Sequence, residues 1–209
     1  WCNNNITISG DEGTIRTLTA VLKSIKTSDE EQSNNVFQSL IGLPQHMSDG
    51  DYKEKWYDTN IEWFGTKWDI SYSEDMFTFT KGEISFFCET AWSPPIPFLQ
   101  HLCEMYKVNA NLFYSEGGVG FSGESTFNWV DGELEVYDDE CGYLEGIYKY
   151  SREEFWSEVE CRVDCILDEE QTLEDFISEF DFVSEEDKEE LTRLYNETIK
   201  ENDEESEGE

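Results

Sequence analysis

The sequence predicts an α+β fold of the split βαβ type, followed by an acidic helical region. Three observations lead to this expectation. Before residue 146, several short segments alternate apolar and polar side chains, as strands with one buried face do. Two segments with apolar side chains at helical spacing lie between them. After residue 146 the spacing is helical throughout, and acidic residues dominate.

The first strand and the first helix have the clearest local patterns. Residues 3–9 alternate as a short strand, and residues 11–26 follow with one apolar stripe at helical spacing. Asp11 or Ser9 is a suitable N-cap, because short polar side chains accept hydrogen bonds from the free N–H groups of a first turn. Residues 46–62 are polar, and we expect a loop there. The apolar stripe consists of Ile15, Leu18, Leu22 and Ile25.

The middle of the chain predicts several strands and a second helix. Residues 66–92 read as successive strands, the first of them over residues 67–72. Residues 93–107 read as a helix, with Ser93 as N-cap and Pro94 at the first helical position. Further strand patterns, separated by glycine-rich turns, follow at 110–118, 118–130 and 132–139.

In chain order these elements are strand, helix, strands, helix and strand, with an extra β-hairpin at the end. This order fits a ferredoxin-like split βαβ sandwich over residues 1–146, with both helices on one face of an antiparallel sheet. Residues 147–200 form an acidic helical region, and residues 201–209 a disordered acidic tail. Ser184 is the expected cap of the last helix. The helical faces are expected at Phe155, Val159, Val163, Ile166, Leu191, Leu194, Tyr195 and Ile199.

The net charge excludes several classes of partner. The chain has 14 basic and 49 acidic residues, a formal net charge of −35, and residues 131–209 hold 31 of the acids against six bases. Such a chain repels nucleic acids and anionic membranes. No apolar run approaches the roughly 20 residues that span a bilayer. We therefore expect a basic protein as partner, with neither direct nucleic-acid binding nor membrane binding.

The cysteines indicate a reducing compartment. All six are irregularly spaced, which argues against a disulfide framework, and Cys88, Cys103 and Cys165 have apolar or aromatic neighbours. We predict buried reduced thiols and a cytoplasmic protein. The imidazole ligands available are His46 and His101, and no CxxC pair is present. We predict no metal and no cofactor.

Four separated motifs occur in order between residues 1 and 130. Their residues are Trp1, Cys2, Asn4; Trp63, Gly65, Thr66, Lys67, Trp68; Trp92, Pro94, Pro95; and Tyr114, Glu116, Gly117. The pattern resembles the YubB-type ferredoxin-like domain family, which is found in phages and conjugative plasmids. The resemblance implies a ferredoxin-like fold, a mobile-element origin and a bacterial host cell, and it implies no catalytic residues. The acidic region after residue 130 lies outside it.

Two groups of side chains allow more than one interpretation. Trp68, Trp92 and Trp129 could form a stacking platform for bases. Large aromatic side chains more often fill a core, and we favour the core. The adjacent carboxylates at 138–140 could bind Mg²⁺ in a hydrolase or nuclease, but they stand in a turn among many equivalent acids. We therefore expect no enzyme.

The spacing of the carboxylates suggests a more specific role. Side chains on one face of a strand are about 6.6–6.8 Å apart, and helix side chains three or four residues apart are separated by about 5–6 Å. Phosphates repeat along a DNA strand at roughly 3.4 Å, so carboxylates on rigid elements can imitate a line of phosphates. The leading hypothesis is a phage- or plasmid-encoded inhibitor that mimics nucleic acid and blocks a host defence protein, such as a CRISPR effector, a restriction enzyme or another nuclease. The expected partner-binding residues are Glu133, Glu135, Asp138, Asp139, Glu140, Glu145, Glu153, Glu154, Glu158 and Glu160.

Two alternatives come from other classes of function. In the first, the C-terminal helices form a protein-interaction module. Its apolar faces around Phe155, Leu191 and Tyr195 bind a partner or a second copy of the chain, and the charge only keeps the protein soluble. In the second, the chain is a metal-dependent hydrolase or nuclease, whose activity a chelator would remove and Mg²⁺ or Mn²⁺ would restore.

Overall fold

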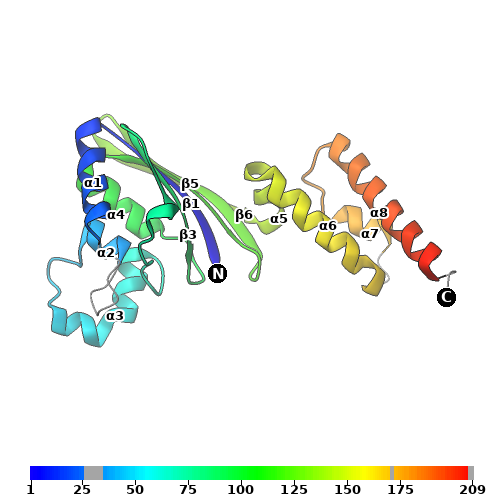
Figure 1. Ribbon diagram of the computed structural model, residues 1–209, viewed down its shortest axis with the longest axis horizontal. Coiled ribbons are helices and arrows are strands. Elements are labelled where there is room, and N and C mark those ends of the chain that lie inside the picture. Colours follow the sequence, from blue (N-terminus) through cyan, green and yellow to red (C-terminus); the bar gives the residue numbers. More distant parts are fainter. Residues whose placement is uncertain (26–34, 170–171, 207–209) are drawn as a thin grey trace. The chain divides into compact units, whose positions relative to one another are not determined.

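The computed structural model describes residues 1–25, 35–169 and 172–206 (Figure 1). It consists of two compact units, Trp1–Glu140 and Cys141–Glu209. The strands are β1 (Cys2–Ser9), β2 (Phe77–Phe79), β3 (Glu83–Thr90), β4 (Asn109–Glu116), β5 (Phe121–Val130) and β6 (Glu133–Gly142). The helices are α1 (Glu12–Ser24), α2 (Val36–Ile41), α3 (Asp49–Phe64), the short 3₁₀ helix η1 (Glu74–Met76), α4 (Ile96–Tyr106), α5 (Tyr143–Tyr150), α6 (Arg152–Glu169), α7 (Leu173–Ser178) and α8 (Glu185–Ser206).

The strands form one sheet in the order β2-β3-β1-β4-β5-β6. The central strand β1 pairs antiparallel with both β3 and β4. The elements β1, α1, β2, β3, α4 and β4 therefore make a split βαβ unit, to which the hairpin of β5 and β6 is added. This confirms the predicted α+β, ferredoxin-like fold. Residues 143–146, which the prediction included in the ferredoxin-like domain, instead begin α5.

One face of the sheet carries the core of the first unit. Ile6, Leu112 and Phe127 stand on neighbouring strands and are at most 1% exposed. Figure 1 shows α1 and α4 along this face, and both helices contact the sheet. Asp11 is the N-cap of α1, as predicted, because its Oδ1 accepts the first free N–H groups of the helix at 2.9 and 3.1 Å. The predicted stripe of α1 is buried at Ile15, Leu18 and Leu22.

Most of residues 46–62 belong to α3, so the prediction of a loop there was wrong. The helix begins with a capping box in which Ser48 Oγ accepts the N–H of Asp51 (3.2 Å) and the Asp51 carboxylate accepts the N–H of Ser48 (3.3 Å). A non-helical residue, Lys55, interrupts it. The helix packs on α4 but exposes most of its side chains, so its sequence carries no apolar stripe.

Residues 67–72 do not form the predicted strand. Ser71 makes one isolated bridge with Asn35, and continuous pairing starts only at Phe77 in β2. The backbone of this segment is placed instead by Asp69, whose carboxylate accepts N–H groups at the start of α2. The alternation of apolar and polar residues therefore gave a wrong prediction here. The segment is held by hydrogen bonds between the Asp69 carboxylate and the start of α2, and not by hydrogen bonds to a neighbouring strand.

The helical unit has a core of its own. Phe155, Val159 and Leu191 are fully buried, and the Phe176 ring contacts Tyr195 with 5.7 Å between centroids. The apolar faces predicted for these helices thus pack against one another. Phe155 and Leu191 are therefore not presented to solvent here, and the alternative in which these faces bind a partner stays a prediction.

The last helix is longer than expected. Ser184 Oγ accepts the N–H of Asp187 (3.2 Å), which confirms Ser184 as its cap. The helix continues to Ser206, so residues 201–206 are helical and not part of a disordered tail. Glutamate is a strong helix former, and glutamates make up much of this last stretch of the helix. The remaining tail and the side chain of Ile166 lie outside the described residues.

Candidate binding surfaces

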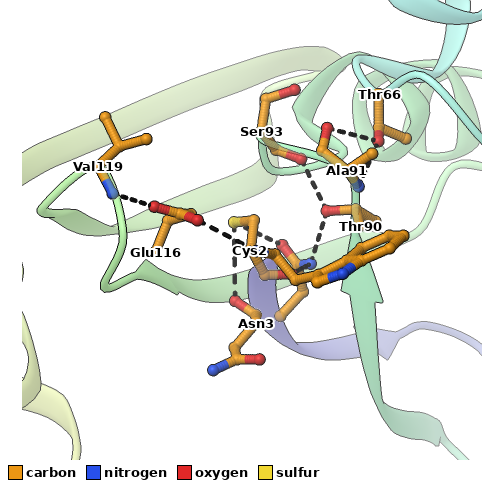
Figure 2. A network of polar contacts seen from close by, with 10 residues as sticks. Cys2, Asn3, Thr66, Thr90, Ala91, Ser93, Glu116 and Val119 are labelled. Carbon is orange, nitrogen blue, oxygen red and sulfur yellow. Dashed lines mark hydrogen bonds and ion pairs between the residues drawn. The ribbon is translucent and has the colours of Figure 1, made fainter.

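The first and last motifs recognised in the sequence meet at one end of the sheet (Figure 2). The fully buried Asn4 donates from Nδ2 to Cys2 O (2.8 Å) and to Thr90 Oγ1 (2.9 Å). Glu116 Oε1 accepts a hydrogen bond from the backbone nitrogen of Trp1 (3.1 Å). Buried polar groups need such partners, and these contacts fix the start of β1 against β3 and the end of β4.

The loop that follows β3 is held by hydroxyl groups (Figure 2). Thr90 Oγ1 donates to Ser93 O (2.7 Å), and Thr66 Oγ1 accepts the N–H of Ala91 (3.1 Å). Ser93 Oγ donates to Gly65 O (2.6 Å), so it is not the N-cap predicted for α4. The second and third motifs are joined by these bonds, which together determine the backbone of the loop.

Trp92 lies in this loop with a left-handed backbone, at φ = 70°. For a bulky side chain this region of conformational space costs about 1–3 kcal/mol. The indole is 54% exposed, so burial of the ring does not compensate for the strain. The hydroxyl contacts on either side of Trp92 hold the conformation, with the result that a large apolar ring is presented to solvent. A strained backbone that exposes its side chain points to a binding role.

Trp92, Trp68 and Trp1 form a tryptophan cluster. Ring centroids of Trp68 and Trp92 are 6.3 Å apart, and those of Trp1 and Trp68 are 5.8 Å apart. Trp68 is 43% exposed. The Nζ atom of Lys67 lies 4.3 Å from the Trp68 centroid and 4.8 Å from that of Trp92, within the range of a cation–π contact. The prediction that Trp68 and Trp92 fill the core was therefore wrong.

Trp129, the third tryptophan considered as a stacking surface, is not brought into this cluster. It stands on β5, half-buried, and its Nε1 donates to Cys103 O on α4 (3.1 Å). The Lys107 Nζ atom lies 3.9 Å from its ring centroid. Trp129 therefore attaches α4 to the sheet. Of the three tryptophans considered together in the sequence, Trp129 is structural, whereas Trp68 and Trp92 are exposed.

Asp69, the neighbour of Trp68, ties the cluster to α2. Its Oδ1 and Oδ2 accept the N–H groups of Phe37 and Gln38, both at 2.8 Å. These bonds replace a local cap, because the N-cap residue Asn35 makes no side-chain cap bond. Burial raises the pKa of the Asp69 carboxyl to about 6, and the N–H groups that it accepts offset only part of this effect.

Two cavities adjoin Trp68 and Asp69. The first has a volume of about 320 Å³, and the second one of about 410 Å³. The sequence did not predict a site here. The motifs contained a signal for it, because three of the four contribute one tryptophan each to the cluster. Residues lining the first cavity include Trp1, Trp68, Asp69, Met76, Glu89 and Thr90. The second is lined by Asn35, Tyr52, Lys53, Trp56, Asn60, Trp68 and Asp69.

Half of the predicted acidic set lies on β6. Glu133 and Glu135 are exposed on one face of this edge strand, where Asp139 is half-buried. Asp138 and Glu140 have the opposite parity and therefore point to the other face. The row of carboxylates expected from residues 133–140 is thus divided between two faces of the sheet.

Asp138 has a structural role that the sequence did not reveal. Its Oδ1 accepts hydrogen bonds from Tyr114 Oη (3.1 Å) and Ser125 Oγ (2.6 Å). The phenol of Tyr114 reaches β6 by crossing β5 at Gly123, where a Cβ atom would lie 2.4 Å from Tyr114 Oη. Burial raises the pKa of Tyr114 far above its ordinary value, and the nearby Asp138 carboxylate adds to the shift. Asp138 is consequently less available to an external partner.

The other five predicted residues lie on α5 and α6. Glu145 and Glu158 are each paired with a base four residues later, at 2.7 and 3.1 Å. Glu154 accepts a long hydrogen bond, 3.5 Å, from a tyrosine hydroxyl. Glu153 and Glu160 are exposed, and no ion pair between described residues involves them. The ten predicted residues are therefore divided between the two units and differ in how far they are already engaged.

The cysteines whose side chains pack in the core are structural. Cys2, Cys88 and Cys103 are buried free thiols, which confirms the prediction for the last two. Burial raises the pKa of Cys103 to about 12. The side chain of Cys165 lies outside the described residues. In the described ranges, no group of three histidine, cysteine or acidic side chains is placed to hold a metal ion, and no helix has the length and apolar character to cross a bilayer.

The strand order and the placement of α1 and α4 define a ferredoxin-like α+β protein with a helical unit attached. The chain belongs to the family described as the ferredoxin-like domain in Api92-like protein, whose model matches residues 67–198. The match begins in the second motif and continues into α8, so this family includes the helical unit that the resemblance over residues 1–130 left outside. No curated protein and no solved structure matches the chain.

Proposed function

We propose that the protein is a non-enzymatic inhibitor that occupies the nucleic-acid-binding groove of a basic protein. The charge of the helical unit is the observation that carries this proposal. Residues 141–209 hold 25 acidic against six basic residues, hence a net charge of −19. A small domain needs a net charge of only about 2–8 for solubility. Self-repulsion of this size destabilises the unit. A basic partner would neutralise the charge and remove that cost, which gives the excess of carboxylates a physical reason.

The bases of the helical unit are engaged internally. Five of the six form ion pairs with carboxylates of the same unit, and the strongest geometry is the bidentate pair of Arg152 with Asp187, at 2.6 and 3.0 Å. A partner therefore meets a field set by the remaining carboxylates. The paired bases are Lys149, Arg152, Arg162, Lys188 and Arg193.

The predicted contact residues differ in whether other side chains of the protein already bind them. Glu133 and Glu135 on β6 and Glu153 and Glu160 on α6 are exposed and lie outside the ion pairs described above. We infer that these four act as the phosphate-like groups, with the engaged Asp138 contributing least. Long-range attraction would bring the basic groove to them, and nucleic acid would be displaced.

The class of target follows from the resemblance to YubB-type proteins of phages and conjugative plasmids. A mobile element benefits from blocking a bacterial defence protein in the host cytoplasm. We therefore propose a restriction enzyme, a CRISPR effector or another defence nuclease as the target. Each of these presents a basic groove to nucleic acid, which is the surface that a folded polyanion complements.

A competition assay tests the proposal. A fluorescent DNA duplex is bound to each member of a panel of restriction enzymes, CRISPR effectors and defence nucleases, and the full chain is titrated against it. We expect displacement from at least one member. A mimic that replaces four phosphates has an expected salt slope of about −3.6, so it should lose about 10²-fold in affinity between about 50 and 200 mM salt. Displacement that is insensitive to salt would refute mimicry.

A matched pair of fourfold variants separates a specific surface from bulk charge. Both remove four exposed carboxylates, so their net charges are equal. Loss of displacement confined to the first variant supports the proposal, whereas equal loss in both would show that only the net charge matters. The first variant is Glu133→Gln, Glu135→Gln, Glu153→Gln and Glu160→Gln. The control is Glu12→Gln, Glu54→Gln, Glu62→Gln and Glu74→Gln, all exposed in the N-terminal unit.

A further inference from the structure

The first cavity combines aromatic rings with negative charge. Trp1 and Trp68 contribute indoles to its lining. Within the described part of the chain, its charged lining residues are Asp69 and Glu89, and both are acidic. The face of an indole attracts cations, and a carboxylate pairs with them. This lining therefore suits a cation and disfavours a phosphate or a carboxylate.

The tryptophan cluster already accommodates an ammonium group. The Nζ atom of Lys67 lies within 5 Å of two ring centroids, at 4.3 Å for Trp68 and 4.8 Å for Trp92. Both rings remain about half exposed, at 43% and 54%. The strained backbone of Trp92 keeps its ring in this position. The cluster is therefore organised to present indole faces before any partner arrives.

We propose that the first cavity binds an arginine side chain of a basic partner protein. The guanidinium group is planar, so it stacks on an indole while its five N–H donors reach carboxylates in a fork. The volume of about 320 Å³ is at the lower end of ligand pockets, which suits one side chain better than a large ligand. In the bound state the guanidinium stacks on Trp68 and pairs with Glu89. Asp69, whose oxygens already accept backbone N–H groups, contributes its charge.

The charge of the N-terminal unit favours this ligand over others with flat faces. Residues 1–140 hold 24 acidic against eight basic residues, hence a net charge of −16. A stacked nucleotide would bring phosphates into this field, and a neutral sugar would leave the carboxylates without a counter-charge. Burial raises the pKa of Asp69 to about 6, and a nearby guanidinium would favour its ionised form.

This inference goes beyond the proposed function. The cavity lies within the N-terminal unit, and none of its residues belongs to the ten carboxylates discussed above. Binding of arginine can therefore fail while displacement of DNA succeeds, and the reverse is equally observable. The two proposals share only the expectation that the partner is basic.

The experiment compares two short peptides on the full chain. The probe is the capped tripeptide Gly-Arg-Gly, and its counterpart contains citrulline, which keeps the shape of arginine and removes the charge. Affinity is measured by NMR titration, with the indole Nε1–H of Trp68 as the reporter. We expect the arginine peptide to bind about 5- to 30-fold more tightly, which is the fold-change equivalent to a cation–π contact of about 1–2 kcal/mol.

Single substitutions locate the binding site. Glu89→Gln removes one charge from an exposed strand position, so the fold is retained, and it should weaken the arginine peptide several-fold. Glu104→Gln removes the same charge from an exposed position on α4 outside the lining of this cavity and should change nothing. Trp68→Leu should remove the preference for arginine over citrulline. This variant lacks the Trp68 reporter, so its titration is followed at the indole Nε1–H of Trp1, which also lines the cavity, and circular dichroism confirms the fold.

Three results would overturn the inference. Equal affinity for both peptides would show that the rings bind without regard to charge. Equal weakening by Glu89→Gln and Glu104→Gln would show diffuse attraction to a polyanion. Absence of any shift at the Trp68 indole at millimolar peptide would show that the cavity does not bind arginine.

Discussion

Replacement of Trp92 by glycine and by alanine separates backbone strain from loss of the indole. Both variants delete the same ring, so the lost contacts with Trp68 and Lys67 cancel in the comparison. At φ = 70° an L-residue costs about 1–2 kcal/mol relative to the right-handed region, whereas glycine adopts this conformation freely. The greater entropy of glycine in the unfolded chain offsets about 0.5–1 kcal/mol. We therefore expect Trp92→Gly to be more stable than Trp92→Ala by about 0.5–1 kcal/mol.

Urea and thermal unfolding of both full-length variants measure this difference. For a chain of 209 residues, 1 kcal/mol corresponds to a Tm difference of about 2–4 °C. Elsewhere in a loop, alanine would be the more stable variant, so the sign is diagnostic. An alanine variant that equals or exceeds the glycine variant would show that the left-handed backbone is not strained. The hydroxyl of Thr66, which accepts the Ala91 N–H, would then not be needed to hold the loop.

Three further predictions concern stability. Gly123→Ala places a methyl group 2.4 Å from Tyr114 Oη, so we expect a loss of about 1–3 kcal/mol in urea unfolding; an unchanged midpoint would mean that Tyr114 does not cross β5 there. The pKa of Asp69 is raised from 3.8 to about 6 in the folded state, so its contribution favours folding below about pH 4 and is lost as the pH rises toward 6; Asp69→Asn should lack this slope in a pH series of unfolding curves. Asp187 has the opposite sign, because its hydrogen bonds with Arg152 lower its pKa; Asp187→Asn should be less stable at pH 7 and approach the wild type only as the pH falls below about 4, and equal stability at pH 7 would exclude a net contribution of the pair.

Elements with their own local signal could be predicted from the sequence. In α1 the buried stripe and the Asp11 cap are both local, and in the helical unit Phe155 and Val159 share one face by spacing alone. The prediction failed at α3, whose polar surface has no apolar stripe, and at residues 67–72, where Asp69 caps a helix more than thirty residues away along the chain. The spacing of apolar residues indicates which side chains are buried only where the helix or strand itself packs on the core.

The candidate sites divide in the same way. The acidic character of the C-terminal region is a property of composition, and it could be stated without coordinates. The engagement of Asp138 depends on Tyr114 reaching across Gly123 from two strands away, which no local pattern contains. Trp68 and Trp92 were predicted to lie in the core because the residues beside a tryptophan along the chain do not show whether its ring is buried or exposed.

The sequence by itself determined the α+β class, the helical character of the C-terminal region and the excess of negative charge, because spacing and composition are summed along the chain. Only the tertiary structure decided that the loop around Trp92 is held in a left-handed conformation and that its indole faces solvent. That outcome depends on hydroxyls and carbonyls of Thr66, Thr90 and Gly65, which the fold of the sheet brings to one place. Exposure is a property of neighbours in space, and these neighbours come from distant parts of the chain.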